Sequence, residues 1–134
     1  MQHAEVKYMT GNEYQKLAMR TNDGESSVRL VEKIAVSGHE DYDIGGIVMA
    51  TMGLSGEVGE LNDMIKKWIF HQPDMDITHA KKELGDIAWY LACMAESFGW
   101  SMDEILQMNV DKLRARYPEG FDIERANHRK AGDV

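Results

Sequence analysis

Apolar residues recur at helical spacing through the middle of the chain. From about Gly46 onward they return every three or four residues, which places them on one face of a helix. They are Leu54, Val58, Leu61, Ile65 and Trp68. A long helix with this face toward a core is therefore predicted.

A second long helix is predicted after a turn at residues 70–74. Pro73 lacks a backbone N–H and clashes with the preceding turn of a helix, so it cannot continue a helix interior. Asp76 or Thr78 can cap the next helix, and Gly99 is expected to end it as a left-handed C-cap. The predicted apolar stripe of this helix is Leu84, Ile87, Leu91, Met94 and Ala95.

Shorter helices are predicted on the N-terminal side. Thr10 and Glu13 form a capping box that opens a helix running to about Arg20. Residues 22–27 break it, and residues 28–36 form a weakly amphipathic segment that is helical or mixed. Residues 37–46 are rich in Gly, Asp and Glu, and are predicted to be a loop.

A last helix is predicted from a second capping box, Ser101 with Glu104, to Tyr117, where Pro118 stops it. The polar tail, residues 119–134, is expected to drape over a neighbour or to fray. The fold class that follows is all-α: a bundle of four to five helices around a central antiparallel hairpin of the two long helices.

Composition narrows the class of protein further. A length of 134 residues fits one domain, which we expect to span residues 1–134. The formal charge of −8 argues against a general nucleic-acid-binding surface. No apolar run is long enough for a membrane helix, and residues 1–5 do not resemble a secretion signal, so a cytoplasmic protein is expected. Cys93 is the one cysteine, which leaves no disulfide framework.

Two short carboxylate motifs carry the candidate chemistry. Glu57 and Glu60 are three residues apart, as are Glu83 and Asp86, so each pair shares one face of a helix. In a hairpin that turns near residue 71 or 72, Glu57 lies level with Asp86 and Glu60 lies level with Glu83. Four facing acids repel one another unless a divalent cation joins them. All-oxygen ligands favour hard ions, Mg²⁺ above all.

Each motif alone can also be explained without a metal, because paired glutamates are common on solvated helix faces. The register across the predicted hairpin is what favours a metal site.

A basic patch lies on the last predicted helix. Asn109, Lys112 and Arg116 fall on one line, with Tyr117 nearby, and Lys and Arg side chains can hold phosphate oxygens. Basic residues in a final helical turn also interact favourably with the helix dipole, which is the alternative explanation. The aromatic residues could stack on a base or belong to the core, and His71 and His79 are expected to face solvent or to cap helices.

These motifs, in this order, resemble the MazG-like all-α nucleoside triphosphate pyrophosphohydrolases. That family's pattern is E-x-x-E, a spacer, E-x-x-D, and then an N-x-x-K element with a basic helix end. Here the N-x-x-K element is Asn109-Val110-Asp111-Lys112. The opening residues 12–21 are also similar to the start of many members.

The resemblance implies Mg²⁺-dependent cleavage of a nucleoside triphosphate between the α and β phosphates, in nucleotide-pool house-cleaning. It implies metal binding by Glu57, Glu60, Glu83 and Asp86, and nucleotide contacts by Asn109, Lys112, Arg116 and Tyr117. Separately from the resemblance, we expect one of the acids, Glu57 or Glu60, to serve as the catalytic base. Some relatives place another glutamate where this chain has Gly56, so the resemblance leaves the general base open.

Two other classes of protein are considered. Helical bundles also hold di-iron centres, but those use Glu-x-x-His motifs, and no Glu here has a His three residues later. A non-catalytic acidic interaction module is the non-enzyme alternative.

A homo-oligomer is also expected. Gly53, Gly56 and Gly59 are costly in a helix, which indicates that a neighbouring helix or a second subunit packs against them. Two long helices alone cannot bury their apolar stripes. A homodimer or a homotetramer is the expected assembly.

Overall fold

The structure is a computed structural model that describes residues 8–37, 42–71 and 74–127. Within these ranges the regular structure is six α-helices and one short 3₁₀ helix, so the all-α class is confirmed. The number of helices exceeds the predicted four to five. The described residues fall into two compact units that divide after Val36. The expectation of one domain over residues 1–134 stays a prediction.

The first unit contains α1 (Gly11–Ala18), η1 (Met19–Thr21) and α2 (Ser26–Ser37). The predicted capping box is confirmed, because Thr10 Oγ1 accepts from the Glu13 N–H and the Glu13 carboxylate accepts from the Thr10 N–H. α2 begins two residues before the predicted segment. The side chains of Asn22 and Asp23 accept backbone N–H bonds two residues on, which closes the connection early.

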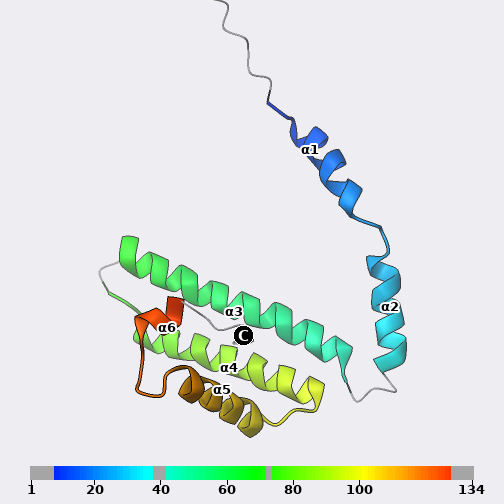
Figure 1. Cartoon of the computed structure of the whole chain (residues 1–134). Helices are drawn as coiled ribbons and strands as arrows, with labels where there is room; N and C mark the ends of the chain where they lie inside the picture. Colours follow the sequence, from blue (N-terminus) through cyan, green and yellow to red (C-terminus); the bar gives the residue numbers. More distant parts are fainter. Residues whose placement is uncertain (1–7, 38–41, 72–73, 128–134) are drawn as a thin grey trace, which may run out of the picture. The chain divides into compact units, whose positions relative to one another are not determined.

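The second unit contains the two long helices, α3 (Ile44–Phe70) and α4 (Ile77–Phe98). They lie side by side along most of their length (Figure 1). The Asp76 carboxylate caps α4 by accepting from the His79 N–H at 2.9 Å, and Gly99 ends the helix at φ 67°; both predictions are confirmed. α3 begins at Ile44, two residues before the predicted start. Of the predicted turn, residues 72 and 73 lie outside the described ranges.

Two close approaches between α3 and α4 set their register. An ideal Cβ on Gly53 would lie 2.1 Å from the ring of Tyr90, and one on Gly46 would lie 2.3 Å from Ser97 Oγ. The Asp43 N–H also donates to the Ser97 carbonyl oxygen at 2.8 Å. Later residues of α3 meet earlier residues of α4, so the two helices run in opposite directions.

Of the three glycines, Gly53 packs against a neighbouring helix, as expected, and packing of a second subunit against Gly56 and Gly59 stays a prediction. Within the described part of the chain nothing lies within 4 Å of an ideal Cβ on Gly56 or Gly59.

The predicted stripe of α4 is partly wrong. Leu84 is 55% exposed and Leu91 is 44% exposed, whereas Ala80, Glu83 and Ala95 are buried. The face of α4 toward α3 is shifted by one residue, because Tyr90 must lie over Gly53. On α3, Val58 and Trp68 are also more exposed than predicted. The α3/α4 pair therefore buries small side chains and one carboxylate rather than a stripe of large apolar residues.

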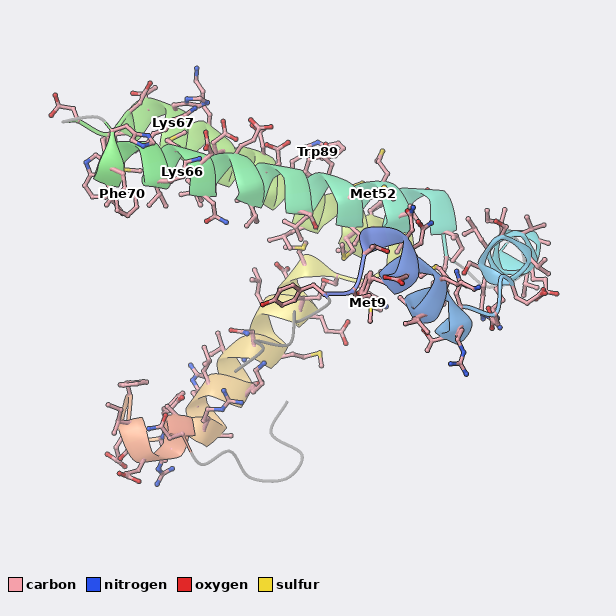
Figure 2. All side chains as sticks on the ribbon, turned by 90° about the horizontal axis from the view of Figure 1, so that it is seen from above. Met9, Met52, Lys66, Lys67, Phe70 and Trp89 are labelled. Carbon is pink, nitrogen blue, oxygen red and sulfur yellow. The ribbon has the colours of Figure 1, made fainter. Side chains whose placement is uncertain are left out.

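Several large apolar side chains remain on the outer surface of the α3/α4 pair. Met52, Phe70 and Trp89 project from these two helices (Figure 2). Met52 is 71% exposed and Phe70 is 72% exposed. No helix in the described ranges is long and apolar enough to cross a bilayer.

The chain continues through α5 (Met102–Arg116) and α6 (Ile123–Asn127). Ser101 occupies the predicted N-cap, but its side chain makes no capping hydrogen bond, so the second capping box is wrong. Residues 123–127 of the predicted tail are helical and not frayed, and residues 128–134 lie outside the described ranges. Arg125 connects α6 to α5 by donating to the Arg116 carbonyl oxygen at 3.3 Å.

Gly53→Ala is expected to lower the free energy of unfolding by about 1–3 kcal/mol, because the new methyl group overlaps the Tyr90 ring. Gly56→Ala, one turn along the same helix, is the matched control. It meets open space and is expected to raise the free energy of unfolding by about 0.5–1 kcal/mol. Urea unfolding curves measure both values, and equal stability of the two variants would contradict the close approach.

Candidate functional site

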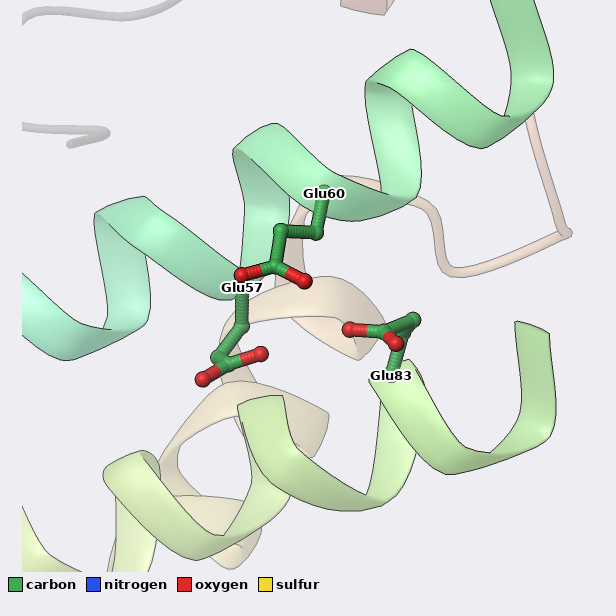
Figure 3. A group of neighbouring side chains, drawn as sticks. All are labelled: Glu57, Glu60 and Glu83. Atoms are coloured by element: carbon green, nitrogen blue, oxygen red, sulfur yellow. The ribbon is translucent and has the colours of Figure 1, made fainter. Parts of the chain in front are cut away.

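Three glutamates converge between the long helices. Glu57 and Glu60 extend from α3 toward α4, and Glu83 extends from α4 to meet them (Figure 3). Carboxylate oxygens from all three lie within 4.8 Å of one another. We call these three residues the acid cluster. The register set by Gly53 and Tyr90 brings the acid cluster together.

Glu83 is the buried member of the acid cluster, with 5% of its surface exposed. Its Oε1 lies 2.7 Å from His79 Nε2. Its Oε2 is buried without a hydrogen-bond partner among the described residues. A buried, unpaired carboxylate oxygen is costly. An atom of this kind, beside two further carboxylates, fits a bound hard cation such as Mg²⁺.

Asp86, the fourth predicted metal ligand, lies outside this group of three. It is exposed and lines a separate cavity of about 330 Å³ with Glu57, Trp89 and Tyr90. Its charge nevertheless reaches Glu57. Asp86 is thus adjacent to the acid cluster without belonging to it in this conformation.

The pKa of the Glu57 carboxyl is raised above its ordinary value of 4.5, first by burial. The charges of Glu60, Asp86 and Glu83 add to the rise, as does a side-chain contact with Glu83. Burial and the neighbouring negative charges each disfavour the ionised form of Glu57. A cation at the site would relieve this repulsion.

The raised pKa of Glu57 predicts a pH-dependent stability in the metal-free protein. The folded protein holds this proton more tightly than the unfolded chain, so the associated stability is lost as pH rises through the raised pKa. In chelator, the melting temperature of Glu57→Gln relative to wild type should rise as pH increases above the ordinary glutamate pKa of 4.5. Glu96→Gln, an exposed acid farther along α4, is the control. A Glu57→Gln difference that stays constant with pH would contradict the shift.

A cavity of about 510 Å³ opens beside the acid cluster, between the last turns of α3 and the first turns of α4. Glu60 and Glu83 form one side of it, and Trp68 and His79 also line it. A flat aromatic ring in the cavity wall offers a stacking surface for a planar group of a ligand.

A positively charged side chain, that of Lys67, lines the same cavity. Lys67 pairs with Asp63 at 2.7 Å, and Lys66 pairs with the same carboxylate. Hydrogen bonds and the positive charges of the two lysines lower the pKa of Asp63 to about 2. These ion pairs are exposed and contribute little stability. They keep Lys67 at the cavity wall while the acid cluster stays free of lysine.

The predicted nucleotide-binding residues lie elsewhere in the described structure. Asn109 and Lys112 line a groove of about 550 Å³ on α5, together with Trp100 and Met108. No residue of the acid cluster lines this groove. Arg116 and Tyr117 lie at the end of α5, where the Arg116 guanidinium is 6.0 Å from the Tyr117 ring centroid. One chain in this conformation does not bring the basic patch to the acid cluster.

Sequence reasoning missed His79 and the cavity beside it. His79 is exposed, as expected, and also contacts the buried Glu83. The available signal was the spacing of four residues between them, which places both on one face of α4. No pattern in the sequence indicates the cavity, because residues of α3 and residues of α4 line it together.

The model of the MazG nucleotide pyrophosphohydrolase domain family matches residues 49–121, which include all four predicted metal ligands. The protein of Mycobacterium phage L5 named Gene 37 protein is 37% identical to this chain over 82 residues. That similarity covers 58% of this chain and 71% of the phage protein. No solved structure gives a significant match.

Proposed function

Since the chain belongs to the MazG nucleotide pyrophosphohydrolase domain family, we propose that it hydrolyses nucleoside triphosphates to monophosphate and pyrophosphate. The observation that carries this proposal is the acid cluster, with its buried and unpartnered Glu83 Oε2. Removal of damaged or noncanonical nucleotides from the nucleotide pool is a role that suits such a reaction.

The acid cluster would hold Mg²⁺, with Asp86 completing the ligand set after a small side-chain movement. When bound, Mg²⁺ would neutralise charge on the phosphate oxygens and lower the pKa of a bound water. The donors present are all carboxylate oxygens, which fit a hard cation and argue against a thiolate or imidazole site.

Glu57 is our candidate for the general base, with Glu60 as the alternative. In this reaction a water oxygen forms a bond to one of the two phosphorus atoms that flank the α–β bridging oxygen. The bond from that phosphorus to the bridging oxygen breaks, and the carboxylate accepts the proton of the water. Glu57 belongs to the acid cluster, so its carboxylate would lie close to a water held there.

The basic patch is proposed to contact the triphosphate. Its residues are Asn109, Lys112, Arg116 and Tyr117. Because α5 and the acid cluster line different cavities, a second copy of the chain could supply one of the two. This agrees with the proposed homodimer or homotetramer. The exposed Met52, Phe70 and Trp89 supply apolar surface for such an assembly, around the proposed central hairpin.

A nucleotide panel assayed for pyrophosphate and orthophosphate separately tests the proposal. Pyrophosphate and monophosphate in equal amounts, without orthophosphate, are expected. Orthophosphate as the first product would contradict cleavage between the α and β phosphates. Absence of any turnover across the panel would favour the acidic interaction module instead.

A further inference from the structure

His79 is the residue outside the predicted site that the structure connects most directly to the acid cluster. Its Nε2 lies 2.7 Å from Glu83 Oε1. The backbone N–H of His79 donates to the Asp76 carboxylate at 2.9 Å. This hydrogen bond fixes the first turn of α4, from which the His79 side chain extends. The His79 side chain is 55% exposed, whereas the Glu83 side chain is 7% exposed.

The close contact with His79 leaves the two oxygens of Glu83 in different situations. Oε1 lies against His79 Nε2, so rotation of the carboxylate is restricted. Oε2 is buried without a partner among the described residues, in a carboxylate that reaches toward Glu57 and Glu60. The contact of His79 with Oε1 thus orients the Glu83 carboxylate, and Oε2 stays available as a metal ligand. Such outer partners of metal ligands commonly change metal affinity or activity by about 10- to 100-fold when removed.

The other charged groups around the cavity do not take over this role in the described structure. Lys67 pairs with Asp63, and Asp76 accepts the backbone N–H of His79. The carboxylates of Glu57 and Glu60 accept hydrogen bonds when ionised, and Glu57 itself contacts Glu83. His79 is the residue whose side-chain nitrogen lies beside Glu83 Oε1 in the described structure.

We infer that His79 is a positioning residue, which orients the Glu83 carboxylate so that Oε2 faces a divalent cation held by the acid cluster. The inference rests on the proposed metal-dependent function. It concerns the 2.7 Å contact of Nε2 with Oε1, across which both the neutral Nε2-protonated imidazole and the imidazolium can donate.

Mn²⁺ binding to the full chain, followed by the electron paramagnetic resonance signal of free Mn²⁺, tests the inference without turnover. His79→Ala is expected to weaken Mn²⁺ binding by about tenfold or more. His79→Gln retains an N–H donor that can reach four residues along the helix, and is expected to restore most of the affinity. His71→Ala, an exposed histidine that ends α3, should bind Mn²⁺ like wild type.

The outcomes separate this inference from the proposed function. Wild-type affinity in folded His79→Ala, checked by circular dichroism, overturns the positioning role even if the enzyme turns over nucleotide. Equal losses in His79→Ala and His79→Gln also overturn it. Weakened binding in His79→Ala with rescue in His79→Gln supports it, even if no nucleotide is hydrolysed. No Mn²⁺ binding by wild type overturns the inference and the metal site together.

Discussion

Replacing Glu60 and Glu83 together by glutamine is expected to lower kcat/KM for nucleoside triphosphate hydrolysis by about 10³-fold. The substitution keeps side-chain shape but removes one charge from each helix of the α3/α4 pair. Metal ions contribute several kcal/mol of transition-state stabilisation, and about 4 kcal/mol corresponds to this loss in rate. Pyrophosphate release under steady-state conditions measures the change.

The fold of this double variant should survive, because glutamine at position 83 no longer buries a charge. Its melting temperature without metal is expected to equal or exceed that of wild type, since repulsion within the acid cluster is removed. A Glu32→Gln, Glu96→Gln variant removes two exposed acids and serves as the control. Retained activity in the Glu60 and Glu83 double variant would show that the acid cluster is not the reaction centre.

Withdrawal of divalent metal is expected to reduce nucleotide hydrolysis to background, and addition of Mg²⁺ should restore it. The acid cluster holds mutually repelling carboxylates, and among the described residues no lysine or arginine pairs with it, so an added ion is expected to make this surface attractive to a triphosphate. Activity with chelator present, compared with activity after excess Mg²⁺, measures the effect.

A thermal-shift experiment distinguishes a metal-dependent nucleotide site from an acidic interaction module. Ligand binding to the native state stabilises by about 2.7 kcal/mol at a ligand concentration of 100 times Kd. Mg²⁺ together with a non-hydrolysable nucleotide should therefore raise Tm more than either alone. Full hydrolysis in the presence of chelator, or no Tm change with both ligands, would contradict a metal-dependent nucleotide site.

Local signals predicted the ends of the helices well. The Thr10 capping box, the Asp76 cap and the left-handed Gly99 depend on residues within one turn of each other, so sequence alone can reveal them. The Ser101 box failed although its residue types were correct. A capping box also requires side chains in particular rotamers, which sequence spacing does not fix.

The face of each long helix was harder to predict, because it depends on the partner helix. An amphipathic pattern placed Leu84 toward the core, but the fit of Tyr90 over Gly53 turns that position outward. The approach of three acids could be expected from the spacing of the two motifs. The separation of Asp86 from them, and the contact of His79 with Glu83, depend on side-chain rotamers and packing.

The contacts at Gly46 and Gly53 have a consequence for how this protein could vary in evolution. They fix the longitudinal alignment of the two helices from the side away from the connecting turn. Insertions or deletions between residues 71 and 76 should therefore be tolerated. One residue added between Gly53 and Glu57 would instead rotate both acids of α3 by about 100° away from α4.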